Sequence, residues 1–296
     1  MFVKDILKAK KPIISFEVFP PKKPSGVEPL YSTIASLSRF DPDFISVTYG
    51  AGGGTKDLTV EIASAVKHQY NIEALAHLTC VGSTRNQIDD ILTSLEAQNI
   101  KNVLALRGDL PSDAGWGTED REFSFAYELI EHIRKRGGFC IGGACYPEGH
   151  TESEDKIKDL LYLKHKIDKG LDFLITQLFF DNELFYSFLD KLALLEVKLP
   201  VVAGILPVLN ANQIKRIQQL SGCSLPKKFV RILERYQDNP KALEEAGIAY
   251  AAEQIVDLLS YGVDGIHIYT MNRPDAAQSI LKNIGNIRES LKSGSS

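Results

Sequence analysis

The sequence predicts an α/β protein with the (β/α)8 TIM-barrel fold, formed as a single catalytic domain over residues 1–296. Eight short runs rich in Val, Ile and Phe alternate with longer stretches of helical period. Most of the runs are continuously apolar, as strands buried on both faces of a parallel sheet are. Parallel strands need crossover helices, and closure of the sheet removes its edges. A doubly wound open sheet is the main alternative, and the number of strands favours the barrel.

The predicted strands follow one another at regular intervals, except before the last one. The longer gap after Leu206 leaves room for extra helices before the final strand. The strands are expected at Ile13–Phe19, Phe44–Tyr49, Glu73–Cys80, Asn102–Leu106, Phe139–Tyr146, Asp172–Phe179, Leu199–Leu206 and Gly265–Thr270.

The intervals between strands carry the apolar spacing of amphipathic helices, with stop signals such as Gly170. A short amphipathic helix is also expected near the N-terminus, where charges interrupt the sequence too often for a secretory signal. The polar tail, about residues 292–296, is expected to be flexible. The main helices are expected at Val27–Ser38, Thr55–His68, Thr84–Ala97, Phe123–Arg136, Ser153–Lys169, Asn182–Leu195, Asn210–Leu220, Pro240–Tyr261 and Pro274–Lys292.

Composition excludes several classes of protein. Lys and Arg number 34 against 38 Asp and Glu, and this near balance argues against a nucleic-acid partner. No apolar stretch approaches the ~18 residues of a membrane span. Cys80, Cys140, Cys145 and Cys223 form no C-x-x-C pair and no zinc spacing, so we expect reduced core thiols in a cytoplasmic protein without a metal site.

Polar side chains gather at the predicted carboxyl ends of the strands, where barrel enzymes place their active sites. A barrel with only a structural role has no reason for such convergence, so we expect an enzyme. The residues concerned are Glu17, Thr48, His77, Arg107, Asp109, Tyr146, Glu148, His150, Gln177, Tyr269, Thr270, Asn272 and Arg273.

Each of these residues also has a structural interpretation. Glu17 is either an ion-pair partner or a general acid kept protonated by its apolar strand. His77 alone is typical of a satisfied core histidine, and Tyr146 and Tyr269 are typical of packing groups. Arg107 and Asp109 are two apart on what is predicted to be extended chain, so they face one way, as an ion pair or as two charges aimed into one pocket.

Two further motifs are weaker. Residues 50–55, Gly-Ala-Gly-Gly-Gly-Thr, resemble part of a dinucleotide fingerprint, but the third Gly is missing and the next strand lacks an acidic ribose ligand. His77, Glu148 and His150 have no spacing that indicates a metal site.

Several linked motifs together resemble the methylenetetrahydrofolate reductase family, in order, from about residue 10 to 290. The length of this sequence resembles that of the bacterial, catalytic form of the family. The matching segments are Ser15–Lys22, Phe44–Gly53, Leu106–Asp109, Tyr146–His150, Thr176–Asp181, Pro207–Val208 and His267–Arg273.

This resemblance implies a homo-oligomeric flavoprotein that binds FAD and reduces 5,10-methylenetetrahydrofolate to 5-methyltetrahydrofolate. NADH or NADPH passes a hydride to the flavin in a ping-pong reaction, and flavin N5 passes it to the folate. Glu17 is implied as the general acid and Asp109 as the carboxylate that stabilises the folate cation. Folate contacts are implied for Glu17, Asp109, Gln177, Gln213, Tyr269 and Arg273.

The resemblance implies FAD contacts as well. Tyr162 and His165 depart from the Asn and Arg of some relatives near the adenosine. The implied FAD-contacting residues are Thr48, His77, Arg107, Gly108, Asp109, Ala126, Tyr146, His150, Asp159, Tyr162, His165 and Lys166. A proline-dehydrogenase-like flavin barrel and a non-catalytic flavin- or folate-binding barrel are the alternatives.

Overall fold

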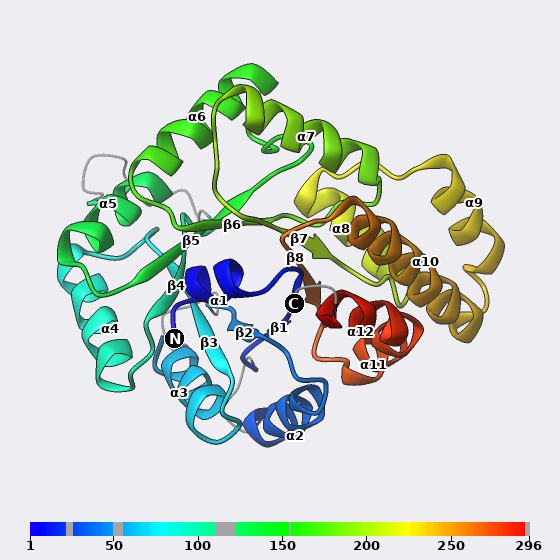
Figure 1. The fold of residues 1–296 in the computed structure, drawn as a ribbon, viewed down its shortest axis with the longest axis horizontal. Coiled ribbons are helices and arrows are strands. Elements are labelled where there is room, and N and C mark those ends of the chain that lie inside the picture. Colours follow the sequence, from blue (N-terminus) through cyan, green and yellow to red (C-terminus); the bar gives the residue numbers. More distant parts are fainter. Residues whose placement is uncertain (22–25, 50–55, 110–121, 154, 294–296) are drawn as a thin grey trace.

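A computed structural model describes residues 1–21, 26–49, 56–109, 122–153 and 155–293. Eight parallel strands close into a barrel in sequence order, with the first paired to the last (Figure 1). This closure confirms the predicted (β/α)8 TIM barrel and excludes the open sheet. The strands are β1 (Ile13–Val18), β2 (Phe44–Val47), β3 (Glu73–Thr79), β4 (Asn102–Leu106), β5 (Cys140–Cys145), β6 (Phe173–Thr176), β7 (Val201–Ile205) and β8 (Gly265–Tyr269).

Helices surround the barrel. Among the described residues they are α1 (Val3–Ala9), α2 (Val27–Ser38), α3 (Lys56–His68), α4 (Arg85–Ala97), α5 (Ala126–Arg136), α6 (Lys156–Asp168), α7 (Asn182–Leu194), α8 (Ala211–Ser221), α9 (Lys227–Tyr236), α10 (Pro240–Tyr261), α11 (Pro274–Asn283) and α12 (Gly285–Ser293). Side-chain caps such as Thr84, whose hydroxyl accepts from Gln87 N, fix several helix starts.

The structure corrects two details of the prediction. Helix α9 was not among the expected helices, although Phe229 and Leu233 are buried with helical spacing. The expected helix Pro274–Lys292 is two helices, which meet at Ile284 and Gly285. Helix α12 ends at Ser293, and residues 294–296 of the expected tail lie outside the described part.

The barrel interior has an apolar half and a polar half. Helix α1 lies across the amino-terminal end of the barrel (Figure 1) and contributes Val3, Ile6 and Leu7 to its buried core. Above this end, toward the carboxyl ends of the strands, the inward positions become polar. The apolar inward residues that pack with α1 include Ile13, Phe44, Leu75, Leu104, Phe173 and Val202.

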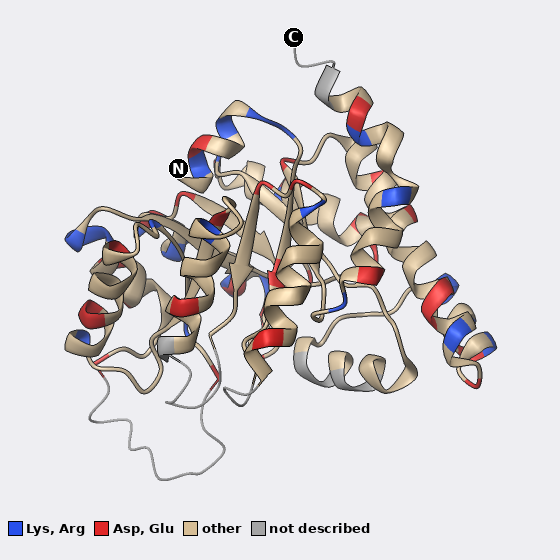
Figure 2. Ribbon diagram, turned by 90° about the horizontal axis from the view of Figure 1, so that it is seen from below, with Lys and Arg blue, Asp and Glu red and all other residues tan. Residues whose placement is uncertain are grey.

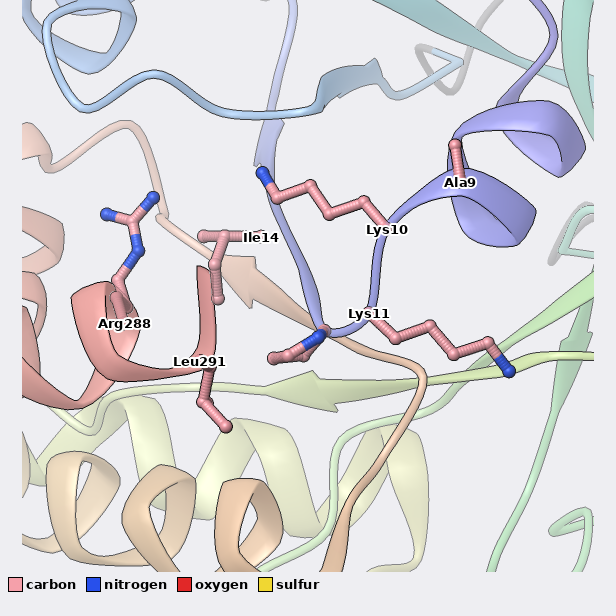
Figure 3. A pocket seen from close by; sticks show the side chains of 7 residues that line it. Ala9, Lys10, Lys11, Ile14, Arg288 and Leu291 are labelled. Atoms are coloured by element: carbon pink, nitrogen blue, oxygen red, sulfur yellow. The ribbon is translucent and has the colours of Figure 1, made fainter. Parts of the chain in front are cut away.

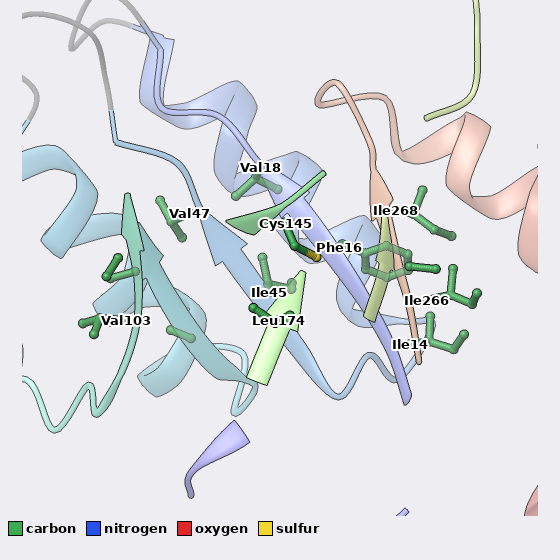
Figure 4. Packing of buried hydrophobic residues seen from close by; sticks show 14 of the residues in the cluster. Ile14, Phe16, Val18, Ile45, Val47, Val103, Cys145, Leu174, Ile266 and Ile268 are labelled. Carbon is green, nitrogen blue, oxygen red and sulfur yellow. The ribbon is translucent and has the colours of Figure 1, made fainter. Parts of the chain in front are cut away.

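A second, larger core fills the space between the strands and the surrounding helices. The alternate strand residues Ile14, Phe16 and Val18 of β1 belong to it, as do Ile266 and Ile268 of β8 (Figure 4). Because successive strand residues point to opposite faces, Ser15 and Glu17 must face the interior. The buried outer face therefore determines which side chains line the barrel.

Aspartates tie the amino-terminal ends of neighbouring strands together. Asp43, Asp172 and Asp264 precede β2, β6 and β8 and accept backbone N–H groups of the preceding strands at 2.8 to 2.9 Å. Each also pairs with a lysine near α1 or in α1 itself. Because this arrangement is repeated three times at the amino-terminal face, away from the end where barrels place their active sites, it supports the fold rather than the chemistry.

The four cysteines are buried and unpaired. In the described part of the chain, no helix is long and apolar enough to cross a bilayer. Within the same ranges, no three His, Cys, Asp or Glu side chains gather in a way that could hold a metal ion. The glycine-rich residues 50–55 lie outside the described residues.

Candidate active site

Glu17 lies inside the barrel near the carboxyl end of β1 and is 6% exposed. Strand register places it beside Ser46 of β2 on one side and Tyr269 of β8 on the other. The Ser46 hydroxyl lies 3.4 Å from Oε2 of Glu17, within hydrogen-bond distance. A carboxyl group in such a position is costly to bury unless it is neutral or paired.

Two buried imidazoles approach the same carboxyl oxygen. Nε2 of His77 lies 3.4 Å from Oε2 of Glu17, and Nε2 of His267 lies 3.7 Å from it. His77 Nε2 is buried without a hydrogen-bond partner among the described residues, so the short approach to Glu17 is not an aligned hydrogen bond. Burial lowers the pKa of His77 to about 4, against a smaller opposite effect of Glu17, so this ring is neutral at pH 7.

Tyr269 closes this group on the β8 side. Its hydroxyl donates to the carbonyl of Thr176 at 2.6 Å. Burial, followed by the charge of Glu17, raises its pKa well above the usual value. A Cβ on Gly204 would lie 2.7 Å from the Tyr269 ring and 2.4 Å from the Thr176 carbonyl, so glycine is required beside this tyrosine.

A second polar group lies at the ends of β4 and β5. Arg107 donates from both terminal nitrogens to the two carboxylate oxygens of Glu152, each at 2.6 Å. This bidentate pair raises the pKa of Arg107 and lowers the pKa of Glu152. His150 packs edge-on against Tyr146 with ring centroids 4.7 Å apart, and burial raises the pKa of Tyr146 to about 12.

Helix α6 adds a lysine to this second group. Lys166 donates to the carbonyl of Ala144 on β5, and burial lowers its pKa. The backbone N–H of His150 donates to Asp159 Oδ2 at 3.2 Å. Burial also lowers the pKa of His150, against the opposing charge of Glu152. The predicted residues Arg107, Tyr146, His150, Asp159 and Lys166 therefore belong to one region of the rim.

The prediction that Arg107 and Asp109 face one way rested on extended chain, and this premise is wrong. Strand β4 ends at Leu106, and Gly108 has a φ of 88°, in the left-handed region. Arg107 therefore pairs with Glu152 of another loop, whereas Asp109 is exposed at the end of a described segment.

The structure does not bring every predicted residue into these two groups. Gln213 uses its side chain on the loop after β7, accepting from Leu209 N at 2.8 Å. Arg273 is exposed, and its pairs with Asp275 and Glu244 raise its pKa. Gln177 accepts from Leu178 N at 2.9 Å.

The remaining predicted residues lie at the rim or on helices α5 and α6. Thr48 continues the pairing of β2 through its backbone N–H to the Val18 carbonyl. Ala126 begins α5. On α6, Tyr162 is 68% exposed, and the His165 ring lies edge-on to Tyr127 with centroids 4.9 Å apart.

Sequence reasoning missed three members of the site. His267 and Ser15 are fully buried and 2.8 Å apart, Nδ1 to Oγ, although 252 positions separate them in the chain. Glu152 was missed because a loop brings it to Arg107. Alternation along β1 and β8 was an available signal for the first two, since both strands place polar residues on the face opposite to their branched apolar ones.

A hollow of about 370 Å3 lies at the other end of the barrel, between the segment after α1, the start of β1 and α12 (Figure 3). Lys10, Lys11 and Arg288 line it. Lys10 and Lys11 pair with Asp43 and Asp264, and Arg288 donates to the Phe40 carbonyl. These contacts serve the fold, so the hollow is not the candidate active site. Charges of both signs are interspersed over the helices (Figure 2).

The closed barrel and the buried acid, imidazole and hydroxyl groups near its carboxyl end define the class: a (β/α)8 barrel with the layout of an active site. The sequence model of the methylenetetrahydrofolate reductase family matches residues 2–285. The chain belongs to this family.

Similar proteins include reductases from bacteria and plants. The chain is 35% identical to "5,10-methylenetetrahydrofolate reductase" of Pectobacterium carotovorum, over 92% of this chain and 90% of that protein, and 33% identical to the Escherichia coli protein of that name, with the same coverage. It is 36% identical to "Methylenetetrahydrofolate reductase (NADH) 1" of Arabidopsis thaliana, over 97% of this chain. The chain spans about half the length of the plant and fission-yeast relatives.

A solved structure shares the fold at low identity. It is an uncharacterized protein from Clostridium thermocellum that binds two copies of 5-methyl-5,6,7,8-tetrahydrofolic acid, with a TM-score of 0.65 and 15% identity over 98% of this chain and 99% of that one.

Proposed function

We propose that this protein reduces 5,10-methylenetetrahydrofolate to 5-methyltetrahydrofolate with FAD as cofactor and a reduced nicotinamide dinucleotide as donor. The observation that carries the proposal is Glu17, a carboxyl group buried at the carboxyl end of the barrel in a member of this family. The names of the bacterial relatives support the reaction. The fold neighbour binds 5-methyltetrahydrofolate, which is the expected product.

The chemistry of the rim fits a dinucleotide with a pyrophosphate. The guanidinium of Arg107 lies at the rim, where it pairs with the carboxylate of Glu152, and Lys166 is a half-buried lysine on α6. At Gly108 an added Cβ would lie 3.0 Å from the Thr79 side chain, so glycine lets the backbone after Arg107 turn closely past Thr79. Arg107, Gly108, His150 and Lys166 would hold FAD, with Thr48, His77, Asp109, Ala126, Tyr146, Asp159, Tyr162 and His165 as further contacts.

When bound there, FAD supplies hydride transfer, which no amino-acid side chain provides. The protein binds the reactants in turn and excludes water from the barrel interior, whose floor is closed by α1. The plant relatives named for NADH make NADH the first donor to test, with NADPH as the comparison.

Glu17 would donate a proton to a ring nitrogen of the folate, and the five-membered ring then opens. Opening leaves a positive charge on the folate, which the carboxylate of Asp109 would stabilise. Gln177, Gln213, Tyr269 and Arg273 would bind the folate. Of these, Tyr269 lies beside Glu17, whereas Gln213 and Arg273 would exchange their present partners for the substrate.

The two half-reactions test this function separately. Purified protein is expected to carry a yellow flavin that NADH or NADPH bleaches without oxygen, and 5,10-methylenetetrahydrofolate is expected to restore the colour. Glu17→Gln should still bleach but fail to recolour with folate, because only the second half-reaction needs the acid. Recolouring at the wild-type rate would refute the role of Glu17.

The same assay separates the alternatives. A proline-dehydrogenase-like oxidoreductase would bind flavin but would not be re-oxidised by the folate. A non-catalytic barrel would bind flavin or folate without bleaching and recolouring. The cytoplasmic location expected from the cysteines and the homo-oligomeric state implied by the resemblance stay predictions.

A further inference from the structure

His267 is buried in the barrel interior beneath Glu17, with contacts to its ring and to both of its ring nitrogens. It is fully buried, its ring stacks on Phe44 with centroids 5.7 Å apart, and Tyr269 packs edge-on against it at 5.3 Å. Its Nδ1 lies 2.8 Å from Ser15 Oγ, and its Nε2 lies 3.2 Å from Ser46 Oγ. Both ring nitrogens therefore have a hydroxyl partner.

These contacts form a chain of hydrogen bonds that ends at the proposed acid. Ser15 Oγ also lies 3.3 Å from the carbonyl of Ile266, to which it can donate. Ser46 Oγ lies 3.4 Å from Oε2 of Glu17. The chain thus runs from the Ile266 carbonyl through Ser15, His267 and Ser46 to Glu17.

Two arrangements of hydrogens satisfy a neutral His267. If Glu17 is protonated, its hydroxyl donates to Ser46, and Ser46 donates to Nε2 of His267. The Nδ1–H of His267 then donates to Ser15, and Ser15 donates to the Ile266 carbonyl. If Glu17 is ionised, His267 Nε2–H donates to Ser46, Ser46 donates to the carboxylate, and Ser15 turns to Nδ1. The first arrangement makes one more hydrogen bond and buries no charge, so it is favoured.

The other titratable groups near Glu17 do not replace Ser46 in this role. His77 approaches from β3 without an aligned hydrogen bond. The Tyr269 hydroxyl on β8 donates to the Thr176 carbonyl, and the titratable groups near that hydroxyl on the far side are Cys145 of β5 and Tyr146, which follows β5. Within the described residues, Ser46 is the one side chain that hydrogen-bonds to the Glu17 carboxyl group.

We propose that His267, acting through Ser46, is a positioning residue that holds Glu17 in its protonated form, ready to donate. This inference rests on the proposed role of Glu17 as general acid. It assigns His267 no contact with folate or cofactor.

Three variants test this chain of hydrogen bonds. His267→Phe keeps the ring on Phe44 but removes both nitrogens, Ser46→Ala removes the relay, and His267→Gln offers an amide oxygen that can accept from Ser46. Ile268→Val is the matched control, because this fully buried neighbour on the same strand faces the outer core. Ser46→Ala carries the test if His267→Phe does not fold.

The expected loss is confined to the folate half-reaction. Its rate at pH 7 should fall roughly 10- to 100-fold in His267→Phe and Ser46→Ala, as for a mispositioned general acid, with the folate KM changed less than about twofold. Its pH profile should shift to lower pH, since Glu17 then loses its proton more readily. Flavin reduction by NADH should be unchanged, the double variant should lose no more, and His267→Gln should recover part of the rate.

Spectroscopy gives a readout that does not depend on turnover. In 15N-histidine NMR spectra of the wild-type protein, the signals that His267→Gln removes should be those of an Nδ1–H tautomer. The infrared band of a protonated carboxyl group, assigned by its absence in Glu17→Gln, should be present at neutral pH and weaker in His267→Phe.

An Nε2–H tautomer in the wild type, or an unchanged pH profile in both His267→Phe and Ser46→Ala, would overturn the inference. A wild-type protein that binds flavin but does not reduce folate would overturn the proposed function instead. The NMR and infrared measurements would still decide whether His267 holds Glu17 protonated.

Discussion

Replacing His77 by Gln is expected to remove about 2 kcal/mol of the loss of stability between pH 7 and pH 5. His77 is buried on β3, and its burial lowers its pKa from 6.5 to about 4. In the unfolded chain, His77 therefore binds a proton as the pH falls below 6.5. In the folded protein, His77 binds this proton only at about pH 4. Stability from this group is complete above pH 6.5 and is lost as the pH falls toward 4.

The magnitude follows from the two pKa values. One pKa unit corresponds to about 1.4 kcal/mol, so the whole window is worth about 3 kcal/mol. Between pH 7 and pH 5 the wild-type protein should lose about 2 kcal/mol through His77 alone. For a chain of 296 residues, this corresponds to a fall of about 3 °C in Tm.

Urea unfolding at pH 7 and pH 5 measures the effect. The protein should first be stripped of cofactor, because a ligand that binds only the folded state adds stability of its own. The difference between the two pH values should be about 2 kcal/mol smaller in His77→Gln than in the wild type. His68→Gln, at an exposed histidine, should keep the wild-type difference. Equal differences in His77→Gln and the wild type would mean that His77 is not a buried neutral ring.

Three further changes test other parts of the structure. Gly247→Ala should lower the free energy of unfolding in urea by about 2–3 kcal/mol, because the added Cβ would lie 1.8 Å from the Val208 carbonyl oxygen. Gly285→Ala is the control, with open space at its Cβ, and should be neutral or slightly stabilising. Equal losses of stability in the two variants would refute this. Asp172→Ala should lower stability by about 1–3 kcal/mol by leaving the Ile141 N–H without its acceptor, and an unchanged Tm would contradict this. Glu152→Gln should strengthen FAD binding by about two- to fivefold in a fluorescence titration, because it frees the Arg107 fork from a partly exposed pair; weaker binding would mean that Glu152 orients Arg107 for the cofactor.

The sequence predicted the strands, and with them the positions of Glu17 and His77, because a short apolar run rich in Val, Ile and Phe is a local property. It did not predict the contact between Ser15 and His267, which depends on the register of β1 against β8. The Arg107–Glu152 pair was missed for a related reason, since two loops meet there. The helix α9 did have a local signal, the spacing of Phe229 and Leu233.

The Asp side chains at the amino-terminal end show the same limit. Asp43, Asp172 and Asp264 each precede a strand, where an aspartate is ordinarily interpreted as a turn residue. Their function in the fold becomes visible only when the neighbouring strand supplies a backbone N–H and a lysine supplies a charge. Partners from separate strands and helices cannot be inferred from a local pattern.

The polar half of the barrel interior is a departure from ordinary core packing that calls for a functional explanation. Barrel interiors are ordinarily filled with Val, Ile and Leu, yet Ser15, Ser46 and His267 are fully buried directly above an apolar floor closed by α1. Apolar residues of similar size would need no hydrogen-bond partners and would satisfy the fold as well. Apolar residues would, however, leave the carboxyl group of Glu17 without the Ser46 hydroxyl inside the barrel. The polar residues are therefore best explained by the acid that they support, since local rules of packing are broken where a site requires it.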